Sequence, residues 1–165
     1  MLAATICPGK GDMDLLLERF ADSLLARGIA VRGLVQTNSA RKDGLPCDMD
    51  VRVLPEGPTL RISQTLGTGA RGCRLDSGAL EEAVARVGAS LSGAQLLIVN
   101  KFGKRESEGG GFRPVIAEAL AQGIPVLCGT NELNRPAFDS FASGMASDLP
   151  PSIEAFEAWF AGQST

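Results

Sequence analysis

Hydrophobic and polar positions follow two patterns along this chain: short continuous apolar runs, and longer stretches in which apolar side chains recur at helical spacing. The continuous runs predict buried strands at residues 2–7, 96–99 and 124–128, and a further strand is predicted at 29–36, where Val31, Leu34 and Val35 are the apolar residues. The helical spacing predicts helices at residues 12–27, 77–91, 112–122 and 136–141, and from residue 152 onward.

The first predicted helix has clear boundary residues. Asp12 or Asp14 is expected to cap its N-terminus, and Gly28 is expected to end it. The apolar residues that form its expected buried stripe are Leu15, Leu16, Phe20, Leu24 and Leu25.

Two further segments, 51–54 and 60–63, alternate between apolar and polar residues around the turn at 55–58, which predicts an antiparallel hairpin. Residues 37–50 are polar and predict a loop. The order of elements predicts an α/β fold in one domain over residues 1–165, with a mostly parallel sheet, helices on both faces and the hairpin at one edge. Ligands of such sheets bind beyond the carboxyl ends of the strands, where segments 7–12, 36–42 and 100–111 are expected.

Composition narrows the possible functions. The 165 residues carry a formal net charge of −3, and seven Phe and one Trp are the only aromatic residues, so we expect no nucleic-acid partner. The chain has no His, the commonest general base and metal ligand, and its four Cys form no CxxC pair, so no metal site is expected. Widely spaced cysteines favour reduced thiols and a cytoplasmic protein.

The apolar start of the chain is short and lacks basic residues, so we expect a first strand there and not a signal peptide. No apolar run approaches the ~18–20 residues that cross a membrane, so no membrane partner is expected. A homodimer is the default expectation for a cytoplasmic domain of this kind.

The apolar strand 96–99 ends in Asn100 and Lys101. In nucleotide-hydrolysing α/β proteins such a strand often ends in acidic residues that hold Mg²⁺ and orient the attacking water. Neither residue here is acidic, so hydrolysis by that route is not expected.

Three stretches carry a family resemblance: 27–36, 63–76 and 98–104. Through them the chain resembles a bacterial family of P-loop-NTPase-like proteins known as a domain of unknown function, and it is more distantly similar to small P-loop nucleoside-triphosphatases. The resemblance implies a three-layer sandwich of the P-loop NTPase type.

The phosphate loop of those distant relatives is only partly matched. Pro8, Gly9 and Gly11 match its pattern, but Asp12 replaces the phosphate-binding Lys and Met13 replaces the hydroxyl that holds Mg²⁺. Lys10 lies one position early. In the later motif Asn100 and Lys101 replace an Asp-Glu pair, whereas Gly103, Glu106 and Phe112 still match. Carboxylates at this helix N-terminus would satisfy it themselves and repel a triphosphate.

Two basic segments remain as candidates for anion binding. Glycines in segment 65–74 allow backbone N–H groups to converge, and arginine guanidinium groups suit oxoanions. The second segment, 100–113, adds further cations. An anion pocket requires that both segments converge. The candidate ligand-binding residues are Gly9, Lys10, Gly11, Gln64, Gly69, Arg71, Arg74, Asn100, Lys101, Lys104, Arg105, Glu106 and Arg113.

Structural interpretations of the same residues stay open. Arg71 and Arg74 could pair with Asp76, Glu81 or Glu82, and Glu106 could be ion-paired or act as a general base. No catalytic residue and no cofactor is assigned.

The leading functional hypothesis is a protein that binds a nucleotide or small anion without hydrolysing it. The alternatives are an accessory protein for a metal oxoanion such as molybdate, which the family resemblance suggests, a triphosphatase with a rearranged site that uses Glu106 and Lys101, and a protein-interaction domain.

Overall fold

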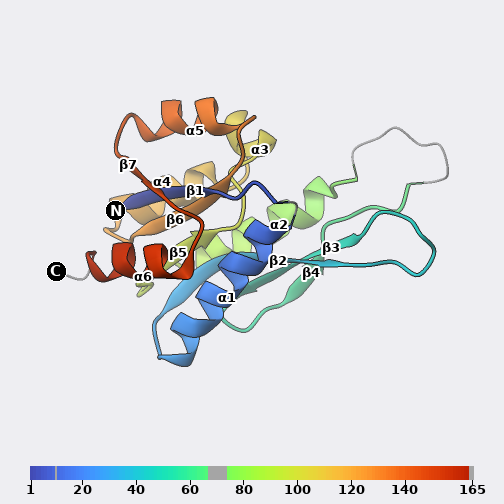
Figure 1. Ribbon diagram of the computed structural model, residues 1–165, viewed down its shortest axis with the longest axis horizontal. Helices are drawn as coiled ribbons and strands as arrows, with labels where there is room; N and C mark the ends of the chain where they lie inside the picture. The colour runs from blue at the N-terminus through green and yellow to red at the C-terminus, as the bar shows by residue number, and fades with distance from the viewer. Residues whose placement is uncertain (10, 67–73, 164–165) are drawn as a thin grey trace.

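The computed structural model describes residues 1–9, 11–66 and 74–163. Within them, seven strands form one sheet in the order β4-β3-β2-β5-β6-β1-β7 (Figure 1). The five strands from β2 to β7 in this order run parallel, and β3 and β4 continue the sheet antiparallel at one edge. The strands are β1 Leu2–Ile6, β2 Val31–Ser39, β3 Asp48–Leu54, β4 Thr59–Arg61, β5 Leu96–Val99, β6 Val126–Thr130 and β7 Ala146–Leu149.

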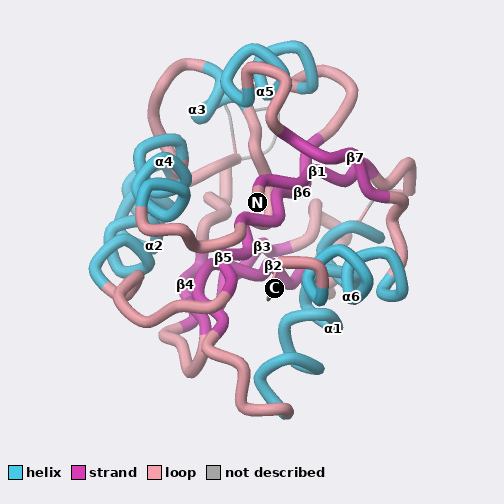
Figure 2. Tube along the Cα trace, turned by 90° about the vertical axis from the view of Figure 1, so that its left-hand side faces the viewer, coloured by secondary structure: helices cyan, strands magenta, loops and turns pink. Residues whose placement is uncertain are grey.

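Helices cover both faces of the sheet (Figure 2). Helices α1 and α6 pack with the apolar cluster of Leu17, Phe20 and Phe156 on one face, and α2, α4 and α5 pack with that of Val84, Ile116 and Phe138 on the other. The predicted α/β class, the three layers and the antiparallel edge hairpin are therefore confirmed. The helices are α1 Asp12–Ala26, α2 Ser77–Ala89, α3 Lys104–Ser107, α4 Arg113–Ala121, α5 Arg135–Ala142 and α6 Ile153–Ala161.

Helix α1 differs from its sequence prediction in two ways. Leu17 is fully buried, whereas Leu15 is 52% exposed, so assigning Leu15 to the buried stripe was wrong. Gly11, at φ 79°, is the N-cap residue, and no side chain makes a capping hydrogen bond. The prediction that Asp12 or Asp14 caps the helix was therefore also wrong, although both carboxylates lie in its first turn.

Strands β2 and β3 form a second antiparallel pair, which extends beyond their apolar residues. Thr37 pairs with Asp50 and Ser39 with Asp48, so the predicted loop 37–50 shortens to residues 40–47. These outer pairs are polar, and the apolar pattern of a buried strand therefore stops before the strand does. Strand β7 and helix α3 were missed, since both are short and largely polar.

All five parallel strands end at the same carboxyl edge of the sheet, which therefore carries the β1–α1 turn, the end of β2 and the segments after β5, β6 and β7 (Figure 1). Among the described residues, no helix is both long and apolar enough to span a membrane.

Candidate functional site

A closed set of hydrogen bonds joins α1, β2 and β5 at the carboxyl edge. The Asn100 side-chain amide donates to Oδ1 of Asp14 at 2.8 Å, and the Asn38 amide donates to Oδ2 at 2.6 Å. Asn100 Oδ1 accepts from the Gln36 N–H at 3.1 Å, and the Gln36 amide donates to Asn38 at 2.9 Å. We call Asp14, Gln36, Asn38 and Asn100 the edge network.

The edge network lies where a hydrolase of this fold class would hold its metal. Both oxygens of Asp14 already accept a side-chain amide, and Asn100 is 5% exposed. The sequence analysis named Asn100 as a site residue but missed its partners. Asp14 lies 86 residues from Asn100 and 24 from Asn38, so no local pattern connects them.

In the β1–α1 turn the Asp12 carboxylate lies close to the backbone of Gly9. A Cβ built on Gly9 would lie 1.6 Å from Oδ2 of Asp12, so this carboxylate lies against the Cα of Gly9. The Met13 side chain contacts the backbone of β6 near Gly129, where a Cβ would lie 3.1 Å from Met13 Cγ. Candidate Gly11 begins the helix, and candidate Lys10 lies outside the described residues.

Lys101 follows β5 directly and is exposed. Its carbon chain lies over Gly103, where a Cβ would come within 3.4 Å of Lys101 Cε. Within the described part of the chain, its ammonium group has no hydrogen-bond or ion-pair partner. A free cation therefore lies beside Asn100 at the carboxyl end of a central strand.

Glu106 organises the segment after Lys101. It is 4% exposed, and its two oxygens accept the N–H groups of Gly103 and Phe112, each at 2.9 Å. This carboxylate therefore ties the two ends of the segment around α3. A Glu three residues after Gly103 matches half of a capping box, which is a local signal that could have indicated this role.

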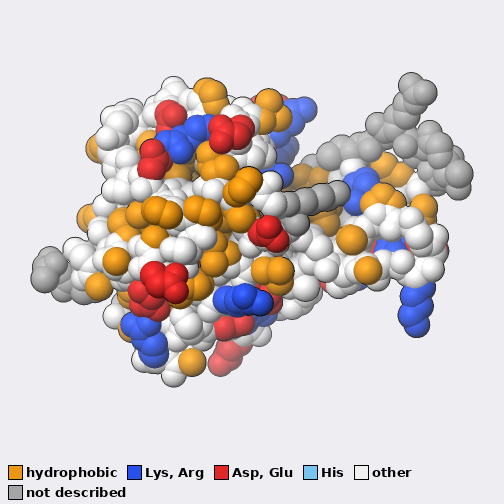
Figure 3. Space-filling view, viewed as in Figure 1, with side chains coloured by type: hydrophobic (Ala, Val, Ile, Leu, Met, Phe, Trp, Pro, Cys, Tyr) orange, Lys and Arg blue, Asp and Glu red, His pale blue; other side chains and the backbone are white. Residues whose placement is uncertain are grey.

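The other cations of this segment have partners. Arg105 donates to Glu81 of α2 at 2.7 Å, and the Lys104 ammonium lies 3.9 Å from Glu108. The Arg113 guanidinium donates to the Glu106 carbonyl at 3.5 Å and lies 5.2 Å from the ring centroid of Phe141. On the face drawn in Figure 3, basic side chains are dispersed among acidic ones and form no continuous patch.

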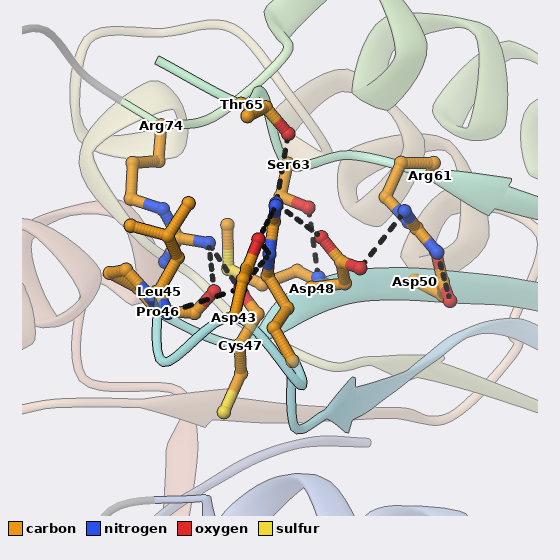
Figure 4. A network of polar contacts seen from close by, with 12 residues as sticks. Asp43, Leu45, Pro46, Cys47, Asp48, Asp50, Arg61, Ser63, Thr65 and Arg74 are labelled. Carbon is orange, nitrogen blue, oxygen red and sulfur yellow. Dashed lines mark hydrogen bonds and ion pairs between the residues drawn. The ribbon is translucent and has the colours of Figure 1, made fainter. Parts of the chain in front are cut away.

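The other basic segment, 65–74, is described only at its two ends. Gln64 donates its amide to the Leu75 carbonyl at 2.8 Å, and Arg74 donates to the carbonyls of Pro46 and Cys47 (Figure 4). Candidates Gly69 and Arg71 lie outside the described residues. Arg74 thus contacts the β2–β3 loop, whereas Arg105 contacts α2, so the two arginines share no partner.

The loop that Arg74 contacts also carries part of a charged cluster. Arg41 bonds Asp43, donates to Thr65 at 2.9 Å and lies 3.5 Å from Asp48, which in turn lies 3.2 Å from Arg61 (Figure 4). We call Arg41, Asp43, Asp48, Asp50 and Arg61 the tip cluster. An open pocket of about 520 Å³ lies beside this cluster and is lined by Arg41, Asp43, Asp48 and Arg61 together with Ala40, Lys42 and Thr65. The hydrogen bond from Arg41 lowers the pKa of Asp43.

The described residues offer neither a metal-binding cluster nor a buried thiol that ionises readily. They contain no group of three or more His, Cys, Asp or Glu side chains that could hold a metal ion. Cys128 is buried, and burial raises the pKa of its thiol well above the ordinary range. Cys7 is half-buried and Cys47 exposed, and both are free thiols.

The sheet order and the helix layers define an α/β fold of the P-loop-NTPase type. The chain belongs to the family described as "Protein of unknown function (DUF2478)", whose model matches residues 2–159. Over 98% of its length it superposes on 95% of THEP1 from the hyperthermophile Aquifex aeolicus, with a TM-score of 0.65 and 14% sequence identity. This likeness concerns the fold alone.

The chain is also similar to one part of a much longer protein. The chain is 35% identical, over 167 aligned residues and 99% of its length, to the molybdenum import ATP-binding protein ModC 2 of Bradyrhizobium diazoefficiens. The match spans 18% of that protein's length.

Proposed function

We propose that this chain binds a nucleotide or a smaller phosphate-like anion at the carboxyl edge of its sheet, without hydrolysing it. The main support is Lys101, an exposed ammonium group that follows the central strand β5 and has no partner among the described residues. Open α/β sheets bind ligands at this edge. Neutral Asn100 beside it adds no negative charge that would oppose an anion.

The proposed lack of hydrolysis rests on the edge network. Asp14, its one carboxylate, accepts two amides, and Met13 offers no hydroxyl for Mg²⁺. Glu106, the nearest buried carboxylate after β5, accepts two backbone N–H groups and is therefore a poor candidate for a general base.

Calorimetric titration with ATP, GTP, AMP and inorganic phosphate, each with and without Mg²⁺, tests the proposal. We expect saturable binding that does not require Mg²⁺. Lys101→Ala should weaken it about tenfold or more, since a charge-assisted hydrogen bond contributes about 1.5–3 kcal/mol. Lys42→Ala is the matched control, because Lys42 is an exposed lysine in the loop between β2 and β3, away from the end of β5.

Two results would contradict this proposal. Equal binding by the Lys101→Ala and Lys42→Ala variants would remove Lys101 from the site. Mg²⁺-dependent phosphate release that persists in the purified protein and disappears in Lys101→Ala would show a hydrolase instead.

A second candidate function is an accessory role in molybdate import, in which the bound anion is molybdate. It is favoured by the match along 99% of this chain to part of a molybdenum import ATP-binding protein. Titration with molybdate, tungstate and sulfate separates it from nucleotide binding. Binding of molybdate and tungstate with no response to ATP would favour this candidate, and indifference to all three oxoanions would exclude it.

We also propose that residues 1–165 form one domain that works in the cytoplasm, consistent with its free thiols at Cys7, Cys47 and Cys128. A homodimer remains part of this proposal, and sedimentation velocity of the purified chain tests it.

A further inference from the structure

Gly103, in the segment after Lys101, does not need to be glycine for its backbone conformation. Its backbone is extended, with φ −119°, outside the left-handed region that favours glycine. A Cβ built on Gly103 would have three atoms of the Lys101 side chain as its nearest neighbours, Cε at 3.4 Å, Cγ at 3.5 Å and Cδ at 3.6 Å. The carbon chain of Lys101 therefore lies along the bare Cα of Gly103, which is buried.

The backbone next to Lys101 is also held in place. Phe102, which follows Lys101, donates its N–H to the Gly129 carbonyl at 2.7 Å, and its carbonyl accepts the Thr130 hydroxyl at 3.0 Å. The Phe102 ring is fully buried and packs edge-on against Phe138, with the ring centroids 5.3 Å apart. The chain that carries Lys101 is therefore fixed against the end of β6.

Thr130 contributes a buried hydroxyl to this arrangement. It ends β6 and is 6% exposed, and burying a hydroxyl costs free energy unless it is hydrogen-bonded. A valine of nearly the same shape would suit a buried strand without that cost. The role of the hydroxyl is therefore its hydrogen bond to the Phe102 carbonyl, which fixes the backbone beside Lys101.

These contacts matter for a lysine that binds an anion. An exposed lysine samples many rotamers, and fixing its ammonium group on a ligand loses side-chain entropy. A carbon chain that already lies along Gly103, on a backbone already held by Thr130, loses less of that entropy when the ligand binds.

We propose that Gly103 and Thr130 are positioning residues that hold the Lys101 ammonium group in one place at the carboxyl edge before an anion binds. Gly103 leaves room for the carbon chain, and Thr130 fixes the backbone through Phe102. The effect on affinity rests on the proposed function, whereas the order of the Lys101 side chain is measured without a ligand.

Carbon-13 relaxation of the lysine Cε groups in the ligand-free protein tests this placement. In the wild type, Lys101 Cε should be more ordered than Cε of Lys42, which is exposed. In Gly103→Val, whose branched side chain occupies the space of the carbon chain, Lys101 Cε should become as mobile as Lys42 Cε. Gly110→Val is the matched control in the same segment, because the three atoms nearest to a Cβ there belong to Arg105. It should leave the order of Lys101 unchanged.

Calorimetric titration with inorganic phosphate and with ATP tests the consequence for binding. Gly103→Val should weaken binding about three- to tenfold, because the side-chain entropy of Lys101 is then lost on binding. Gly110→Val should bind like the wild type. Thr130→Val should also lower the order of Lys101 and the affinity, and it provides the measurement if Gly103→Val does not fold. Thr130→Ser keeps the hydroxyl and should retain both properties.

Equal mobility of Lys101 Cε and Lys42 Cε in the ligand-free wild type would overturn the inference. So would folded Gly103→Val and Thr130→Val proteins that keep the wild-type order of Lys101. An ordered Lys101 that loses its order in both variants, in a protein that binds neither phosphate nor ATP, would support the placement and overturn the proposed function. The two failures are therefore distinguishable.

Discussion

The edge network and the tip cluster use similar side chains in opposite ways. In the edge network one carboxylate is shared by two amides, Asn100 is buried, and the neighbouring Lys101 stays unpaired within the described residues. In the tip cluster Arg41 and Arg61 are matched by Asp43 of the loop 40–47 and by Asp48 and Asp50 of β3. The comparison shows that the tip cluster, with its high density of charges, leaves neither of its arginines unpaired. We therefore propose that a cation without a partner at a buried strand end is a better guide to a binding site.

The largest expected effect is in the edge network. Asn100→Asp places a second carboxylate against Asp14, in place of an amide that donates to it at 2.8 Å. We expect the free energy of unfolding to fall by about 2–4 kcal/mol, through repulsion and loss of the donor in a partly desolvated site. Urea denaturation measures the change. Asn38→Asp faces the same carboxylate from an exposed position and should cost less than about 1 kcal/mol; equal effects would mean that burial does not govern this network.

A smaller loss is expected at Glu106. Glu106→Gln replaces one acceptor oxygen with an NH₂ group that would face the N–H of Gly103 or Phe112. We expect a loss of about 1–3 kcal/mol in the free energy of unfolding, because one buried N–H loses its acceptor. Glu108→Gln, at a side chain that is 57% exposed, is the control. No difference between the two variants would show that the Glu106 carboxylate does not hold this segment.

In the tip cluster the expected effect is local. Arg41→Ala removes the ties from residues 40–47 to Asp48 and Thr65. Hydrogen exchange at Leu45 should accelerate about tenfold, whereas the urea midpoint of global unfolding should not change, because local opening of exposed segments is separate from global unfolding. Lys42→Ala should leave exchange unchanged. A shifted global midpoint in Arg41→Ala would show that the tip cluster stabilises the whole sheet.

The smallest effect concerns the ionisation of Asp43. The hydrogen bond from Arg41 lowers the pKa of this carboxyl below its ordinary value of about 3.9. Because the folded-state pKa is lowered, any stabilisation is present above about pH 4 and is lost as the pH falls through the lowered value. In Arg41→Ala the Asp43 pKa should rise toward about 3.9, as followed by NMR of the side-chain carboxyl. An unchanged titration would exclude the Arg41 contact in solution.

The candidate site shows where sequence reasoning stops. The position of Lys101 was predictable, because a residue directly after the apolar run 96–99 lies at the carboxyl edge of the sheet. The spacing of Glu106 from Gly103 was a local signal for its hydrogen bond to the Gly103 N–H, but no local signal indicated that Glu106 is buried. The proposed convergence of two basic segments depended on residues far apart in the chain, and the described arginines contact other partners.

The sequence alone determined the α/β class, the antiparallel hairpin and the absence of an acidic residue at positions 100 and 101, since apolar periodicity and residue identity are local properties. Tertiary structure alone decided that Asp14 bridges Asn38 and Asn100, that β2 and β3 extend to Ser39 and Asp48, and that Lys101 stays unpaired among the described residues. These outcomes depend on the packing of α1 over the sheet and on strand register, which join residues that no local pattern relates.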